Sequence, residues 1–374
     1  MSLRKKLGFL HAFLLPVFVV IGYYAGGGWN FLTLVVVYGV FPVQDWLMGL
    51  DPENPRPEDE KALSDDRYFR FVTYAWVYVQ VALLVWAAWA FAVESWSLWP
   101  AVGFLLGVAT VTGGIGITVA HELGHRTDWL ERFYAQVLLV TVGYGHFFIE
   151  HNQGHHVWVA TPRDPATSRK NENFYAFWLR TVTGSWLSAW RIETARLRKK
   201  GIAPWSFKNR MLWYAMLPVL LCAVLTAGVY ASTGLEAALW RVPLFFTGQS
   251  VGAFTLLELV NYVEHYGMVR REIAPGRYER VNPLHSWNAN PLLSNFYLFQ
   301  LPRHADHHAH ANRRYQILRH LAESPQLPAG YATMVQVALL PPLWFRLMNS
   351  RLEAWERQGM KNRSGGPQEM KNKK

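Results

Sequence analysis

The chain has 374 residues, of which 51% are hydrophobic and 15% aromatic, a heavy apolar load for a soluble enzyme but typical of a protein that lies in lipid. Its formal net charge is +11, which fits contact with anionic membrane lipid. No basic stripe with interleaved exposed aromatic residues occurs in a recognisable module, so nucleic acid is excluded as an expected partner.

Six apolar segments are long enough to cross a hydrocarbon core of about 30 Å, which takes roughly 20 helical residues. With six crossings the two termini share one side of the membrane. Apart from Arg241, at the margin of one connection, every lysine and arginine falls on that side. The positive-inside rule therefore predicts cytoplasmic termini in a bacterial-type inner membrane. The predicted spans lie near residues 7–25, 30–49, 71–92, 99–120, 211–231 and 240–262.

The segments between and after these spans are predicted to form a helical cap on the cytoplasmic side, made of residues 121–210 and 263–357. The predicted fold is therefore an all-α integral membrane protein with a single domain over residues 1–357. The polar, Gly-, Lys- and Asn-rich sequence of residues 358–374 is predicted to be a disordered tail.

Nine of the fourteen histidines lie in four short clusters, all on the cytoplasmic side of the predicted topology. His121 and His125 are four residues apart at the end of the fourth span, so both imidazoles project from one helical face. Neutral imidazole is the commonest protein ligand for transition metals. The candidate ligands are His121, His125, His151, His155, His156, His265, His304, His307 and His308.

Nine imidazoles exceed what one ion can hold, and sharing them between two ions gives four or five each. An all-nitrogen shell argues against magnesium and calcium and leaves iron, copper, zinc and cobalt open. The sequence HELGH at 121–125 also fits an intramembrane zinc peptidase with Glu122 as general base, although such a zinc needs only three protein ligands. Two metal ions are therefore the predicted count. A non-catalytic lipid-binding scaffold is disfavoured, because it would leave the histidines unexplained.

Carboxylates near the histidines are candidates to orient them. A ligating imidazole usually donates its second N–H to a carboxylate or carbonyl, which fixes its tautomer and ring orientation. Direct ligation by a carboxylate also stays open. The acidic residues close enough in sequence are Glu122, Glu150, Asp164, Glu264 and Asp306.

These motifs resemble those of the membrane-bound alkane 1-monooxygenases, the AlkB type, within the wider histidine-rich di-iron hydroxylase and desaturase group. The resemblance runs from about residue 20 to 355. It implies that the nine histidines hold two non-haem irons, and that one atom of O2 enters the terminal methyl of a medium-chain n-alkane to give a primary alcohol. It rests on HELGH (121–125), GYGHFFIEHNQGHHVWVATPRDPATSR (143–169), NYVEHYG (261–267) and GRYERVNPLHSWNANPLLSNFYLFQLPRHADHH (276–308).

The resemblance also implies electron supply from NADH or NADPH through a reductase and rubredoxin. Because Cys222 is the only cysteine, the chain cannot hold a four-cysteine iron site or an iron–sulfur cluster. No bound haem or flavin is expected either, so the electrons must come from another protein. The predicted dock for an acidic rubredoxin is a basic group in the cap, Arg303, Arg313, Arg314 and Arg319.

An alkane offers no polar handle, so selectivity for its end is expected to come from an apolar tunnel lined by spans two, four and six. The alternative within the group is a xylene or other aromatic-methyl monooxygenase with the same metal site, but NPLHSWNANP (282–291) favours alkanes. A desaturase is disfavoured because the HYG signature belongs to the hydroxylases. The tunnel candidates are Val37, Phe41, Leu257 and Val260.

Overall fold

The structure, a computed structural model, describes residues 1–364. Within them, six helical segments are long and apolar enough to cross a membrane, and each coincides with one predicted span. This confirms the prediction of an all-α integral membrane protein with six spans. The segments are Lys5–Ala25, Gly27–Met48, Arg67–Val93, Leu98–Gly124, Arg210–Thr233 and Ala238–His265.

The third, fifth and sixth spans are continuous α-helices, whereas the other three change helical type along their length. Side-chain caps begin two of them: Asp66 accepts a hydrogen bond from the backbone N–H of Tyr68, and Asn209 accepts one from Met211. In chain order the span elements are α1 (Leu3–Gly8), η1 (Phe9–Phe13), α2 (Leu14–Ala25), η2 (Gly27–Phe31), α3 (Leu32–Val35), η3 (Val36–Val40), α4 (Phe41–Met48), α6 (Arg67–Val93), α7 (Leu98–Thr110), η5 (Val111–Gly116), α8 (Ile117–Gly124), α13 (Arg210–Thr233) and α14 (Ala238–His265).

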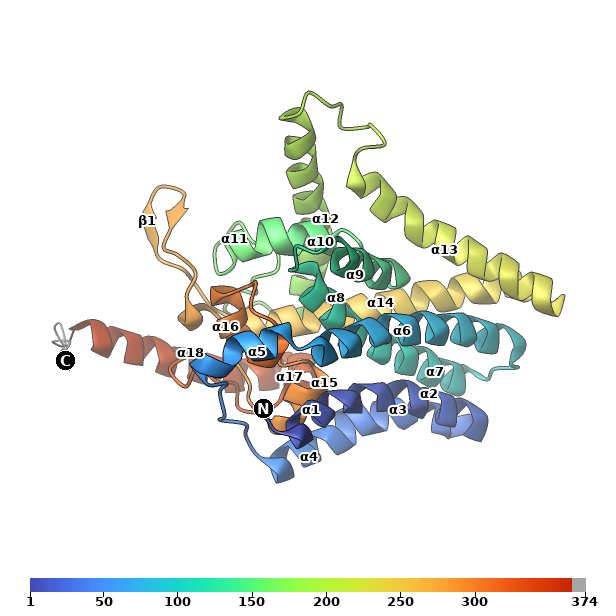
Figure 1. The fold of residues 1–374 in the computed structure, drawn as a ribbon, viewed down its shortest axis with the longest axis horizontal. Coiled ribbons are helices and arrows are strands. Elements are labelled where there is room, and N and C mark those ends of the chain that lie inside the picture. Colours follow the sequence, from blue (N-terminus) through green and yellow to red (C-terminus); the bar gives the residue numbers. More distant parts are fainter. Residues whose placement is uncertain (365–374) are drawn as a thin grey trace.

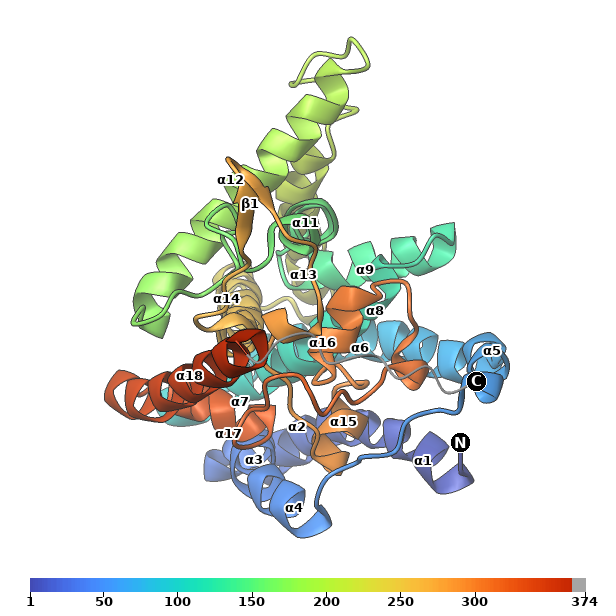
Figure 2. The same ribbon diagram turned by 90° about the vertical axis from the view of Figure 1, so that its left-hand side faces the viewer.

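Most other elements gather at one end of the bundle, where the N-terminus and α18 also lie (Figure 1), and they make up the cap. Seen from that end, α16 lies near the middle with α8 and α14 around it (Figure 2). The cap contains one antiparallel hairpin, β1–β2, that the sequence did not predict. The elements outside the spans are η4 (Pro57–Asp59), α5 (Glu60–Asp65), α9 (Trp129–Thr141), α10 (Phe147–Glu150), η6 (His151–His155), α11 (His156–Trp158), α12 (Phe174–Arg198), β1 (Glu272–Ala274), β2 (Arg277–Tyr278), η7 (Pro283–His285), α15 (Leu292–Tyr297), α16 (His304–Ala309), η8 (Tyr315–Ile317), α17 (Tyr331–Ala338) and α18 (Pro341–Ser364).

The final helix, α18, continues to Ser364 and so passes residue 358, where the predicted tail begins. The helix thus overlaps residues 358–364 of the predicted tail. The rest of that predicted tail, residues 365–374, lies outside the described residues.

The fourth span forms the centre of the bundle. In its most apolar window 78% of the residues are buried, against 22% for the fifth span and 17% for the second, so the latter two leave most of their surface for lipid. Glycines bring its neighbours close: a Cβ on Gly113 would lie 2.6 Å from the backbone oxygen of Ala253 in α14. The side chains at the end of this central span therefore project from a helix that is packed tightly against its neighbours.

We expect Gly113→Val to lower the free energy of unfolding by about 1–3 kcal/mol, because the backbone of α14 must move to admit the side chain. The matched control is Gly228→Val in α13, where a Cβ meets no atom within 4 Å. Thermal unfolding of both variants in detergent measures the difference. Equal stability of the two variants would contradict the close packing of spans four and six.

Candidate metal centre

The nine candidate histidines converge at the cap end of the bundle as two separate groups. Within each group the ligand nitrogens all lie within 4.8 Å of one another. The first group draws on α8, η6, α11 and α16, and the second on η6, α14 and α16. The first group is His121, His125, His151, His156 and His307, and the second is His155, His265, His304 and His308.

Neighbouring imidazoles point their Nε2 atoms toward one another in both groups. Two nitrogens bound about 2.1 Å from one ion at right angles are roughly 3 Å apart, so these separations fit a shared ion. The Nε2–Nε2 distances are 3.3 Å for His121–His125, 3.1 Å for His125–His151, 3.0 Å for His151–His156, 3.2 Å for His156–His307, 3.3 Å for His265–His304, 2.9 Å for His304–His308 and 3.3 Å for His155–His308.

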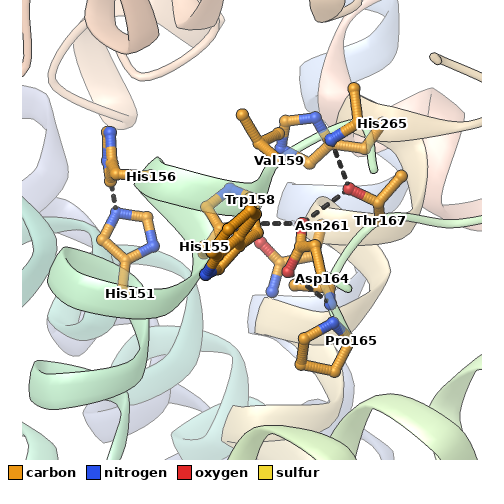
Figure 3. Close-up of polar contacts among 12 residues, drawn as sticks. His151, His155, His156, Trp158, Val159, Asp164, Pro165, Thr167, Asn261 and His265 are labelled. Carbon is orange, nitrogen blue, oxygen red and sulfur yellow. Dashed lines mark hydrogen bonds and ion pairs between the residues drawn. The ribbon is translucent and has the colours of Figure 1, made fainter. Parts of the chain in front are cut away.

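A π-helical turn decides how the HNQGHH segment divides its histidines. Residues His151–His155 form the π-helix η6, in which residues five apart lie on one face. His151 therefore faces His156, while His155 turns away toward Asp164 and Thr167 (Figure 3). An ordinary α-helix would instead have aligned residues four apart. The π-turn is the reason that one segment serves both groups.

Asp164 orients His155 from behind. Its Oδ2 lies 2.8 Å from His155 Nδ1 and also accepts a hydrogen bond from the Thr167 hydroxyl, while Oδ1 accepts one from the Ala166 N–H. Burial raises the pKa of Asp164, but His155 and these hydrogen bonds outweigh it and hold the pKa below its usual value. The charged carboxylate favours the proton on Nδ1, which leaves the Nε2 lone pair for a metal.

Six of the candidate imidazoles outside the spans are neutral at neutral pH, because their surroundings disfavour the protonated ring. Desolvation by burial, followed by repulsion from neighbouring imidazoles, lowers the pKa of each well below its usual value. At neutral pH each ring therefore keeps an unprotonated nitrogen, which metal binding requires. This holds for His125, His151, His156, His304, His307 and His308.

Glu264 lies at the second group itself. Its Oε2 is 3.2 Å from His304 Nε2, the nitrogen that also faces His265 and His308. Its Oε1 accepts a hydrogen bond of 2.7 Å from the hydroxyl of Tyr331 in α17. The carboxylate is thus on the ligand side of the imidazole, where direct contact with a bound ion is possible.

The other predicted carboxylates have different partners. Glu122 forms a 2.6 Å ion pair with Arg126, and Asp306 pairs with Arg313 at 2.6 Å. These contacts differ from the prediction that both carboxylates orient metal-binding imidazoles, because each carboxylate instead forms an ion pair with an arginine that is nearby in the sequence. Glu150 is buried, and its Oε1 has no hydrogen-bond partner in the described part of the chain. Among the described residues, Asp164 and Glu264 are the two of these five carboxylates with a hydrogen bond or ion pair to a candidate ligand.

The predicted docking arginines also need a correction. Arg303 is 1% exposed, donates to the Leu318 carbonyl and pairs with Asp51 at 2.9 Å, so its guanidinium cannot meet a partner protein. Sequence alone did not reveal the distant Asp51. The other three each pair with a carboxylate, which offsets their charge: Arg313 with Asp306, Arg314 with Glu131 and Arg319 with Glu60.

An apolar cavity that is open at one side reaches both histidine groups. His121 and His151 of the first group and His304 of the second lie in its wall, as does Glu264. It lies between spans one, two, four and six, α15 and α17. The four tunnel candidates from the sequence, Val37, Phe41, Leu257 and Val260, all line it.

Two residues of this site were not predicted. Tyr331 reaches Glu264 from 67 residues away in the chain, so no local pattern indicates it. Thr167 follows Asp164 by three residues, and that short spacing was a usable signal for a hydroxyl donor to the same carboxylate.

The fold and these convergent imidazoles define a multi-pass membrane protein with a histidine-rich metal centre, and a profile of the fatty acid desaturase family matches residues 94–338. Alkane 1-monooxygenase 2 of Pseudomonas aeruginosa is 44% identical over 329 residues, 87% of this chain and 85% of the relative. Alkane 1-monooxygenase of Ectopseudomonas oleovorans is 39% identical over 358 residues, 94% and 86% of the two chains. The chain belongs to the alkane 1-monooxygenase family.

A more distant relative is the xylene/toluene monooxygenase hydroxylase component XylM of Pseudomonas putida. It is 29% identical over 360 residues, 93% of this chain and 90% of the relative. The lower identity over a similar length favours the alkane-oxidising relatives over the aromatic ones.

We expect Asp164→Ala to weaken metal binding about 10- to 100-fold, because His155 loses the carboxylate that fixes its tautomer. The control is Asp45→Ala, which removes a buried carboxylate bonded to Ser294 rather than to a histidine. Metal retained during titration with a chelator measures the effect. Equal retention in the two variants would mean that Asp164 does not position a ligand.

Proposed function

We propose that this chain is a di-iron monooxygenase that hydroxylates the terminal methyl of medium-chain n-alkanes. The observation that carries the proposal is the apolar cavity whose wall includes His121, His151 and His304 of the two histidine groups. In the proposed reaction, alkane, O2, two electrons and two protons give a 1-alkanol and water. The electrons come from rubredoxin and, upstream of it, a reductase.

The donor set fits two iron ions. Five imidazoles of one group and four of the other supply only nitrogen, which suits a transition metal, and family membership favours iron among these metals. When bound, the irons would supply the activation of O2 and the attack on the C–H bond, chemistry that side chains alone cannot perform. The two groups of imidazoles would hold the ions, and Asp164 fixes the orientation of one of these rings, His155.

The cavity wall supplies orientation. An alkane is recognised only through its shape, so a narrow apolar channel must bring one chain end to the histidines. Val37 and Phe41 from span two and Leu257 and Val260 from span six all belong to the lining, and such apolar walls keep bulk water from the alkane. Polar groups gather at the histidine end, where Asn261 and Glu264 lie in the lining.

We further propose that the cap faces the cytoplasm of a bacterial inner membrane. The lysine and arginine distribution supports this orientation through the positive-inside rule. It places both termini and the histidine groups on the side where soluble rubredoxin is available.

We expect the purified protein to contain two irons per chain and to form 1-octanol from octane with O2, rubredoxin and its reductase. Metal analysis and gas chromatography of the products measure both. A faster reaction with m-xylene than with octane would favour the aromatic alternative. One zinc per chain with peptide cleavage would instead support an intramembrane peptidase and overturn the proposal.

We expect Val37→Trp to shorten the longest alkane that is accepted, because the indole fills part of the cavity beside span two. The control is Val35→Trp on the same span, where the valine is 57% exposed and lies outside the cavity lining. Product profiles for a series of alkanes from hexane to hexadecane measure the limit. If both variants keep the wild-type profile, Val37 does not lie on the substrate path.

A further inference from the structure

A second pocket, polar and open to solvent, lies between α12 and the loop that follows α11. We call it the arginine pocket. Its lining consists of Trp158, Pro162, Arg163, Asp164, Pro165, Arg169, Arg180, Gly184, Ser188, Arg191 and Ile192. Four arginines and one acid among these residues make it strongly positive.

Most of that positive charge is free. Arg180 pairs with Glu172 at 2.7 Å, but Arg163, Arg169 and Arg191 are exposed and form no ion pair among residues 1–364. The Arg163 guanidinium carbon lies 4.6 Å from the centroid of the Trp158 ring, a cation–π contact within the pocket lining. The lone acid, Asp164, is turned inward and does not neutralise the rim.

The floor of the arginine pocket leads directly to the second histidine group. Asp164 lines the pocket, and its Oδ2 lies 2.8 Å from His155 Nδ1 (Figure 3). His155 Nε2 in turn lies 3.3 Å from His308 Nε2. One carboxylate and one imidazole therefore separate the pocket from a bound ion. Electron tunnelling falls steeply with distance, so a carrier seated here would have a short route to the centre.

Another polar pocket includes His125 in its lining but carries a balanced charge. Its lining contains Arg70, Arg126 and Arg314 together with Asp128 and Glu131. Arg314 pairs with Glu131, and Arg126 pairs with Glu122. A negative partner gains less there than at the arginine pocket, where three guanidinium groups face solvent without an ion pair.

We propose that the arginine pocket is the docking and electron-entry site for a small acidic one-electron carrier protein. This inference rests on the proposed function, which needs two electrons per turnover that the chain cannot store. The carrier would dock twice, each time becoming oxidised by one electron, while the two protons come from solvent. The arginine pocket would bind the acidic face of the carrier, in place of the predicted dock around Arg303.

The position of the pocket favours a protein over a lipid headgroup. α11 and the hairpin β1–β2 stand on the side of α12 away from the six spans (Figure 1). Arg163 also lies beside Gly276 of that hairpin. The mouth of the pocket therefore belongs to the solvent-facing end of the molecule, where a soluble carrier can approach.

The test uses Arg163→Glu and Arg191→Glu in full-length, iron-loaded protein in nanodiscs of neutral phosphatidylcholine, with rubredoxin as the carrier. We expect each variant to raise the KM for rubredoxin about tenfold at low ionic strength, with an effect that shrinks as salt is added. The Kd for rubredoxin, measured without turnover, should rise in parallel. Iron content and kcat at saturating rubredoxin should stay at the wild-type values.

The matched control is Arg198→Glu, which reverses an exposed charge on the same helix outside the pocket lining. We expect its KM and Kd to match the wild type. Unchanged KM and Kd in Arg163→Glu and Arg191→Glu would overturn the proposal, and so would an equal rise in the control. Unchanged values together with lost binding to phosphatidylglycerol vesicles would assign the pocket to lipid instead.

Failure of the proposed function has a different signature. A wild-type protein that binds rubredoxin through the arginine pocket but makes no alkanol, even with dithionite as reductant, would contradict the alkane reaction and leave the docking site intact. A wild-type protein that makes alkanol would support the alkane reaction. If the arginine variants of that protein keep their rubredoxin affinity, the docking site is contradicted.

Discussion

Convergence of buried imidazole lone pairs is the constraint on which this structure depends. Nitrogens that point at one another across about 3 Å in a water-poor interior repel unless a cation or a shared proton lies between them. A neutral imidazole carries a single N–H, so hydrogen bonds within a group of four or five cannot satisfy every ring. At His155 the Nδ1–H donates its hydrogen bond to Asp164, so the Nε2 lone pair is left for a metal ion.

Much of the architecture serves to hold these rings in place. The central fourth span carries His121 on a heavily buried helix, and α14 carries His265 at its end. The π-turn η6 and the short helix α16 each divide their histidines between the two groups. The same elements form the inner end of the apolar cavity, so metal binding and substrate positioning share one scaffold.

Local signals in the sequence were sufficient for part of this arrangement. Hydropathy alone located all six spans, and the clustering of the histidines identified every member of the two groups. Asp164 was found because it lies close to His155 in the chain. Helical spacing near the depth of the site also picked four residues that line the cavity.

Features that depend on contacts between residues far apart in the chain could not be predicted from local sequence patterns. His155 and His156 belong to different groups because of a π-turn, and no local sequence pattern predicts that turn. Arg303 was taken for a surface cation because its partner, Asp51, is far away in the chain. Tyr331 meets Glu264 only through the docking of α17 on α14. In each case a long-range contact, rather than the residue's own type, decides the role.

Location of the metal ions tests the central claim most directly. A structure of the iron-loaded protein with anomalous scattering recorded at the iron edge should contain two iron peaks per chain. One peak should lie among His121, His125, His151, His156 and His307, and the other among His155, His265, His304 and His308. A single peak, or a zinc signal in place of iron, would contradict a di-iron centre divided between these two groups.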